Sequence, residues 1–100
     1  MAIKDFVDKA IADNKVVIFS KTWCGFCTRA KRTIASGYPD IQTAIYELDT
    51  RDDGDDIQAY LLEKTGQTTV PNIFINQQHI GGSDSLLALK SKGELDGLLK

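Results

Sequence analysis

Cysteine, histidine and proline are scarce in this sequence: its 100 residues include two cysteines, one histidine and two prolines. A structural zinc site normally takes four Cys or His ligands. This chain has only Cys24, Cys27 and His79, so a zinc site would have to be shared between chains. Long apolar runs are also absent. The longest cover residues 16–19 and 86–89, whereas a membrane helix needs about 18 apolar residues, so no membrane association is expected.

Charge of neither sign dominates. The chain has 12 Lys and Arg against 14 Asp and Glu, a net charge of −2, which provides no broad cationic surface for a phosphate backbone. Nucleic acid is therefore not an expected partner. With 42% hydrophobic residues, the chain can build one modest core, and its length predicts a single domain over residues 1–100.

The N-terminus lacks the apolar segment and small-residue cleavage site of a signal peptide, and Asp5 and Asp8 interrupt it. We therefore expect a cytoplasmic, reducing environment. There, two cysteines three positions apart are more typical of catalysis or metal binding than of a structural disulfide.

The order of apolar and turn-forming residues predicts an α/β fold. Helical spacing indicates helices, and short β-branched runs indicate strands. The expected helices cover residues 2–13, 28–36, a segment after the acidic cluster 52–56 that ends at Gly66, a short segment beginning at Ser83 as N-cap, and 95–99. The expected strands cover 16–19, 44–48, and a hairpin of 73–75 and 78–80 around Asn76 and Gln77. This order predicts a mixed four-stranded sheet with helices on both faces.

The two cysteines lie where the first strand gives way to the second helix. Cys24 is expected at the helix N-terminus, where unpaired N–H groups and the helix dipole lower the pKa of a thiol. Lys21, three residues earlier, can add positive charge near that sulfur. Cys27 falls one turn into the helix and is expected to be less exposed. The asymmetry predicts that Cys24 attacks a disulfide and that Cys27 can displace it by closing an internal disulfide.

Two other interpretations of these residues remain. Both cysteines could be ordinary core residues, since free cysteine is among the most buried residue types. They could also bind a metal shared between chains. His79 alone is expected to be an exposed strand residue.

Three segments, in this order and spacing, resemble a dithiol glutaredoxin. They are Lys21-Thr22-Trp23-Cys24-Gly25-Phe26-Cys27, Thr69-Val70-Pro71 and Gly81-Gly82-Ser83-Asp84. The resemblance covers essentially the whole chain and implies a thioredoxin-like sandwich. It further implies an enzyme that reduces protein-glutathione mixed disulfides and protein disulfides, with glutathione as electron donor.

The resemblance also implies roles for individual residues. Cys24 would take up the glutathionyl group and Cys27 would resolve it. Val70 would pair its backbone with the cysteinyl unit of glutathione beside a cis Pro71, although the residues alone favour an ordinary strand-starting proline. The implied glutathione-binding residues are Lys21 and Gln58 at the glycine carboxylate, Ser83 and Asp84 at the γ-glutamyl end, and Cys24, Phe26, Thr69, Val70, Pro71 and Gly82.

The sequence departs from the family pattern at three positions. Phe26 stands where many relatives have tyrosine, and Ser85 stands where a second aspartate is usual. Gly25 replaces a common proline, which frees an amide and leaves the backbone mobile.

Two other functions remain open. Some glutaredoxins bind a [2Fe-2S] cluster between two protomers, through the first active-site cysteine of each and two glutathiones. Cys24-Gly25-Phe26 also begins the CGFS signature of the monothiol branch. A cluster-bridged homodimer is thus the alternative to a monomeric enzyme, with Cys24 as the only metal ligand of the chain. The third interpretation is a thioredoxin-type reductant. Thioredoxins usually have proline where Phe26 stands and lack the Gly81-Gly82-Ser83-Asp84 signature, so the sequence favours this interpretation least.

Overall fold

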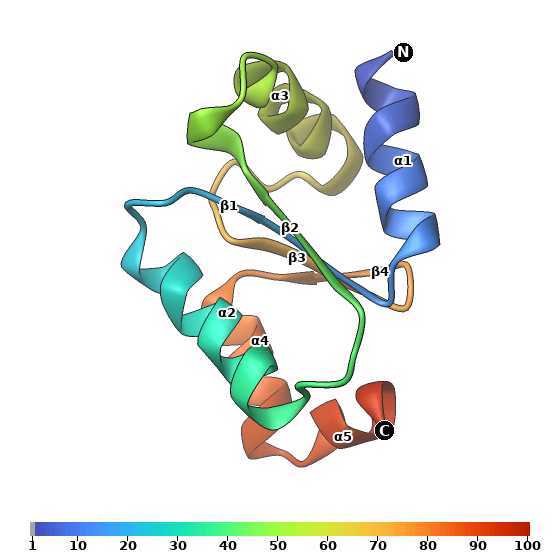
Figure 1. Ribbon diagram of the computed structural model, residues 1–100, viewed down its shortest axis with the longest axis vertical. Coiled ribbons are helices and arrows are strands. Elements are labelled where there is room, and N and C mark those ends of the chain that lie inside the picture. The colour runs from blue at the N-terminus through green and yellow to red at the C-terminus, as the bar shows by residue number, and fades with distance from the viewer. Residues whose placement is uncertain (1) are drawn as a thin grey trace.

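The computed structural model describes residues 2–100 and has a central sheet between two helical layers (Figure 1). Along the chain, the elements are α1 (Ile3–Asp13), β1 (Val16–Ser20), α2 (Gly25–Gly37), β2 (Thr43–Glu47), the 3₁₀ helix η1 (Leu48–Thr50), α3 (Gly54–Thr65), β3 (Asn72–Ile75), β4 (Gln78–Gly81), α4 (Ser83–Ser91) and α5 (Glu94–Leu99). The predicted element order is confirmed, and the predicted boundaries differ from these mainly at α2, which begins three residues earlier than expected.

The four strands form one mixed sheet in the order β2-β1-β3-β4. β1 runs parallel to β2, as a crossover through a helix requires, and antiparallel to β3. All five residues of β1 are buried, which agrees with its continuous apolar sequence. β1 is therefore an interior strand of the sheet. The loop that follows its C-terminal end, which carries Cys24, begins between two neighbouring strands.

Alternate residues of β1 supply two separate cores. Val16 and Ile18 face a cluster formed with α2, α4 and α5, whereas Val17 and Phe19 face a cluster formed with α1 and α3. Figure 1 shows this division, with α1 and α3 on one side of the sheet and α2, α4 and α5 on the other. The predicted thioredoxin-like architecture, with helices on both faces, is confirmed.

β3 and β4 form the hairpin expected around Asn76 and Gln77. Both turn residues have positive φ, 51° and 67°, the combination found in two-residue hairpin turns whose twist matches the strands. Glutamine is an unusual residue there, because the left-handed region favours glycine and asparagine. The turn is held from outside, since Asn76 Nδ2 donates to the carbonyl of Leu98 at 2.9 Å.

The prediction that Ser83 caps α4 is wrong. Gly82 is the N-cap, with extended backbone (φ −97°, ψ −165°), and Ser83 is already the first helical residue. Its hydroxyl is buried and has no hydrogen-bond partner among residues 2–100. The helix therefore begins one residue earlier than a Ser83 N-cap would allow.

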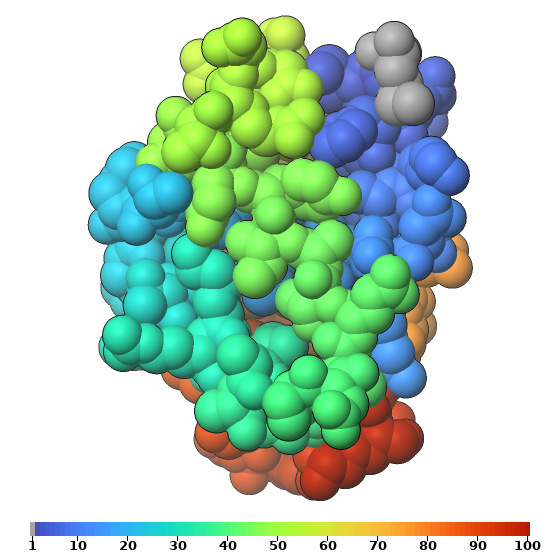
Figure 2. All heavy atoms as spheres, viewed as in Figure 1, coloured from blue at the N-terminus to red at the C-terminus, as the bar shows by residue number. Residues whose placement is uncertain are grey.

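The face in Figure 2 is formed largely by α2 and the edge strand β2, with a hollow between them. Lys31, Ile34 and Ile45 are among the residues that line this hollow. Within residues 2–100, no helix combines the length and apolar character that crossing a membrane requires.

Candidate active site

Cys24 is the N-cap of α2, so its side chain meets the free amides of the first helical turn. The backbone N–H of Cys27 donates to Cys24 Sγ at 3.4 Å. The Cys24 carbonyl in turn accepts from the Thr28 N–H at 3.1 Å and from the Thr28 hydroxyl at 3.2 Å. The sulfur thus takes the position of the oxygen in a usual serine or aspartate cap, where a negative charge is favoured.

The two thiols differ in exposure. Cys24 is 8% exposed and Cys27 is fully buried. The Cys24 thiol also contacts the carbonyl of Val70, with Sγ and O 3.8 Å apart. Only Cys24 therefore offers a sulfur that an incoming disulfide can reach, and it does so beside Val70.

The two thiols also differ in acidity. Burial raises the pKa of Cys24, but this is outweighed by hydrogen bonds from Cys27 and from the Phe26 amide and by the charge of Lys31, so the pKa is lowered. Burial raises the pKa of Cys27 and, despite opposing hydrogen bonds from the Lys21 backbone and the Ser20 hydroxyl, it stays raised. At neutral pH, Cys24 is thus the better source of thiolate and Cys27 stays protonated.

The charge of Lys31 adds to the hydrogen bonds that lower the pKa of Cys24, whereas the sequence pointed to Lys21 as a nearby cation. The Lys21 ammonium lies 5.6 Å from the centre of the Trp23 ring. Lys31 lies two turns along α2 and forms an ion pair with Glu47 of β2, with Nζ and Oε2 2.8 Å apart. Both side chains are about a quarter exposed (22% and 26%), so solvent screens this charge only in part.

Replacing Lys31 with methionine should raise the pKa of Cys24, because a nearby positive charge that favours the thiolate is lost. At a pH below the pKa of Cys24, where thiolate is limiting, alkylation of Cys24 by iodoacetamide should slow by roughly two- to fivefold. The measurement is the alkylation rate between pH 4 and 9. Lys92→Met, an exposed lysine at the end of α4, is the matched control. An unchanged pH profile for Lys31→Met would show that its charge does not reach the sulfur.

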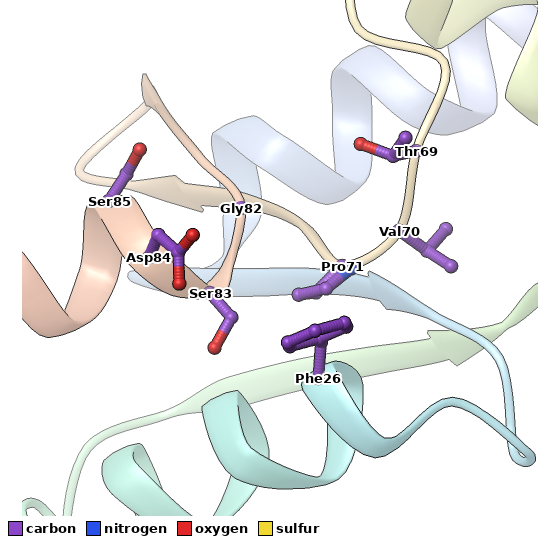
Figure 3. A pocket seen from close by; sticks show the side chains of 8 residues that line it. All are labelled: Phe26, Thr69, Val70, Pro71, Gly82, Ser83, Asp84 and Ser85. Carbon is purple, nitrogen blue, oxygen red and sulfur yellow. The ribbon is translucent and has the colours of Figure 1, made fainter.

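A cleft of about 360 Å³ opens next to Cys24, between the start of α2, the loop before β3 and the start of α4 (Figure 3). Figure 3 shows the Phe26 ring facing Pro71, with Ser83 and Asp84 at the far end. The Val70–Pro71 peptide bond is cis, as the resemblance implied and the residues alone did not. The residues that line the cleft are Phe26, Thr69, Val70, Pro71, Gly82, Ser83, Asp84 and Ser85.

The cleft therefore brings together seven of the predicted binding residues from three separate segments. Lys21, Cys24 and Gln58 are not among its lining residues, although the Cys24 sulfur contacts the carbonyl of Val70, which is one of them. The Gln58 amide donates instead to the Thr68 carbonyl, with Nε2 and O 2.7 Å apart, so Gln58 contacts the loop that carries the cleft wall. Its predicted contact with a ligand carboxylate stays a prediction.

Trp23 and Phe26 are the most exposed large apolar side chains near Cys24, at 71% and 58%. The Arg29 guanidinium lies 5.7 Å from the centre of the Phe26 ring, so each aromatic ring has a cation beside it. The surface around Cys24 is thus both apolar and positively charged, whereas Asp84 lies at the far end of the cleft.

Sequence reasoning missed Asp49, which holds the loop before Cys24. Asp49 Oδ1 accepts from the Thr22 N–H at 3.0 Å, and the Thr22 hydroxyl donates to the other carboxylate oxygen. The hydrogen bonds from the Thr22 side chain and backbone lower the pKa of Asp49, despite partial desolvation, so it remains ionised. The contact spans 27 positions, and no local motif in the sequence signals it.

The family model that matches the chain is described as glutaredoxin and covers residues 16–80. Glutaredoxin-1 of Rhizophagus irregularis is 48% identical over 97% of this chain and 94% of its own length. Glutaredoxin-2 of Schizosaccharomyces pombe is 48% identical over 96% of this chain and 86% of its own length.

Solved structures agree with these sequence relatives. The holo form of glutaredoxin C1 from Populus tremula x tremuloides has a TM-score of 0.90 and 35% identity, over 99% of this chain and 96% of its own. A complex of buckwheat glutaredoxin with glutathione has a TM-score of 0.91 and 41% identity, over 97% of this chain and 86% of its own. The chain, with its activated Cys24 beside a cleft, belongs to the glutaredoxin family of glutathione-dependent thiol oxidoreductases.

Proposed function

We propose that this protein reduces mixed disulfides between protein thiols and glutathione, with Cys24 as nucleophile. The observation that carries the proposal is the inequality of the two thiols. Cys24 is at a helix N-terminus with a lowered pKa, and it adjoins a cleft large enough for part of a tripeptide. Cys27 is buried behind it with a raised pKa, so the first attack belongs to Cys24 alone.

In the proposed first step, the Cys24 thiolate attacks the glutathione sulfur of the mixed disulfide. A new disulfide forms between Cys24 and glutathione, the old disulfide breaks, and the protein thiolate leaves and takes a proton from solvent. In the second step, the thiolate of another glutathione attacks the glutathione sulfur held on Cys24. Oxidised glutathione leaves and the Cys24 thiolate is restored. Oxidised glutathione contains the glutathionyl group of the substrate and the incoming glutathione, so each cycle consumes one free glutathione and releases one protein thiol.

The cleft supports a specific orientation of the bound glutathionyl group. Its sulfur must reach Cys24, and the Val70 backbone lies at that end. The first-turn N–H groups of α4 can donate to the carboxylate of the γ-glutamyl unit, and the Asp84 carboxylate can pair with the α-amine. The relative from buckwheat was solved with glutathione bound, which supports binding of the same tripeptide here.

Cys27 provides a second route. It can attack Cys24 of the mixed disulfide, which closes an internal Cys24–Cys27 disulfide and releases glutathione. The N–H of Cys27 already points at Cys24 Sγ, so the two residues are adjacent in the reduced protein, where both cysteines are free. This route would allow reduction of ordinary protein disulfides.

The electron donor tests the proposal. Turnover of a glutathionylated peptide should require glutathione, with glutathione reductase and NADPH to recycle it, and the measurement is NADPH consumption. Thioredoxin reductase without glutathione should support less than about a tenth of that rate, because the second step uses a glutathione thiolate. Equal rates with thioredoxin reductase alone would contradict the proposal and favour the thioredoxin-type interpretation.

The cluster-bridged homodimer gains no support from the arrangement of ligands. Among residues 2–100, no group of three or more His, Cys, Asp or Glu side chains could hold a metal ion. Cys24 alone could ligate a [2Fe-2S] cluster from this chain, because Cys27 is fully buried, so three further ligands would have to come from a second copy and from glutathione. The cluster remains the alternative that the sequence left open.

A further inference from the structure

Gln67 donates to the two carbonyl groups on either side of Val70. Its Nε2 lies 2.9 Å from the Thr69 oxygen and 2.9 Å from the Pro71 oxygen. We infer that Gln67 is a positioning residue, which orients the Val70 backbone for glutathione and is itself held by His79. The inference rests on the proposed function, because Val70 matters only if its backbone meets the bound tripeptide.

Peptide planarity explains how a contact with Thr69 acts on Val70. The Thr69 carbonyl and the Val70 N–H belong to one peptide unit, and in a trans unit they point in opposite directions. A hydrogen bond that pulls the Thr69 oxygen toward Gln67 therefore turns the Val70 N–H away from Gln67. Without that bond, rotation of the whole unit would cost little, because Thr69 lies in an exposed loop.

Gln67 also lies against the opposite wall of the cleft. A Cβ placed on Gly81 would be 3.9 Å from Gln67 Oε1, and a Cβ on Gly82 would be 3.7 Å from the Pro71 oxygen. Gly82 leads directly into α4, which carries Ser83 and Asp84. The Gln67 side chain thus lies between the loop that carries Val70 and the Gly81–Gly82 turn. That turn leads into the part of the cleft proposed to bind the γ-glutamyl unit of glutathione.

His79 on β4 fixes the far end of Gln67. Its Nε2 lies 3.2 Å from Gln67 Oε1 and 2.9 Å from Asn72 Oδ1. Both partners are oxygens, because the amide nitrogens of Gln67 and Asn72 are themselves donors, the latter to Thr65 Oγ1 at 3.4 Å. Nε2 must therefore carry hydrogen and donate to both.

Asn72 anchors this arrangement in the protein interior. It is 1% exposed and pairs with Phe19 of the central strand β1. Partial burial lowers the pKa of His79, which favours the neutral ring, and that ring has its proton on Nε2 as the two oxygens require. The line of contacts runs from the sheet through Asn72 and His79 to Gln67 and the cleft.

The test compares Gln67→Leu with the unaltered protein in reduction of a glutathionylated peptide. Leucine has nearly the same size but neither donates nor accepts, so the Val70 peptide unit is released. We expect KM for the peptide to rise about five- to tenfold, a loss typical of one or two hydrogen bonds to a ligand, while kcat stays within about twofold. The alkylation pH profile of Cys24 should not move, because Gln67 does not contact the sulfur.

Two controls separate positioning from general stability. Gln42→Leu makes the same chemical change at an exposed site just before β2. This site lies beside the start of β1, whereas Cys24 follows the end of β1, so KM should be unchanged. His79→Phe removes the donor but keeps a ring and should raise KM about two- to fourfold, whereas His79→Gln, which keeps an N–H donor, should restore at least half of that loss. A structural role alone would lower thermal stability without this donor-dependent recovery.

The outcomes distinguish the inference from the proposed function. If the unaltered protein does not use glutathione to reduce the peptide, the proposed function fails. If it does, but Gln67→Leu has the KM of the unaltered protein, only the inference fails. Equal KM values for His79→Phe and His79→Gln would remove His79 from the arrangement and leave Gln67 acting alone.

Discussion

Cys24→Ser should lower reduction of a glutathionylated peptide by more than about a thousandfold, because a serine hydroxyl cannot form the disulfide on which turnover depends. The helix N-terminus that lowers the pKa of Cys24 remains, but a hydroxyl is far less acidic than a thiol and stays protonated there. The measurement is steady-state turnover with glutathione, glutathione reductase and NADPH. Folding should be intact, since serine is a common helix N-cap and can accept from the Cys27 N–H.

Cys27→Ser is the matched substitution and should behave differently. The Cys27 side chain is fully buried and its pKa is raised, so it does not take part in the first attack. Turnover of the mixed disulfide should stay within about threefold of the unaltered protein, because glutathione can complete the cycle on Cys24 alone. Reduction of an internal protein disulfide should fall by more than about tenfold, because that reaction needs the Cys24–Cys27 disulfide.

The pair of substitutions can contradict the mechanism in two ways. If Cys27→Ser loses mixed-disulfide turnover as severely as Cys24→Ser, the resolving step is obligatory and the route through Cys24 alone is wrong. If Cys24→Ser retains activity, the buried Cys27 must be the nucleophile. The greater exposure and lower pKa of Cys24 would then not identify the attacking thiol. Mass spectrometry of the trapped glutathione adduct identifies the cysteine in either case.

The fold could be predicted from the sequence because its periodicities are strong and local. The apolar run of β1, the turn at Asn76 and the helix end at Gly66 each follow from residues within a few positions. The position of Cys24 at a helix N-terminus followed in the same way. These features depend on backbone propensity, which short stretches of sequence express directly.

Contacts between distant segments could not be predicted in this way. Asp49 contacts Thr22, Lys31 contacts Glu47, and Gln67 contacts His79. Each depends on a side-chain rotamer and on how two elements pack, so spacing along the chain has no information about it. The effect of Lys31 on the Cys24 thiol could not be predicted for the same reason, because Lys31 lies two turns further along α2.

Gly54→Ala should cause the largest loss of stability of any glycine-to-alanine substitution in the described chain. Gly54 is the first residue of α3 and is buried against η1. A Cβ there would lie 1.9 Å from the Leu48 carbonyl oxygen and 2.8 Å from its carbon. Both are backbone atoms, so no side chain can rotate aside, and either α3 or η1 must move.

That movement would disturb both the core and the active-site loop. Leu48 is buried in the cluster that α1 and α3 share, and the next residue, Asp49, holds Thr22 beside Cys24. Overpacking with backbone displacement costs about 3 kcal/mol or more, which for a domain of this size lowers the midpoint of thermal unfolding by at least about 12 °C. Differential scanning calorimetry measures it.

Gly97→Ala is the control for glycine itself. Gly97 lies inside α5 and a Cβ there meets no atom within 4 Å among the described residues, so alanine should leave stability unchanged or raise it by up to about 1 kcal/mol through its higher helix propensity. The two substitutions make the same chemical change in a helix and differ only in the space available. If Gly54→Ala unfolds within about 2 °C of the unaltered protein, α3 does not pack as closely on Leu48 as the structure has it.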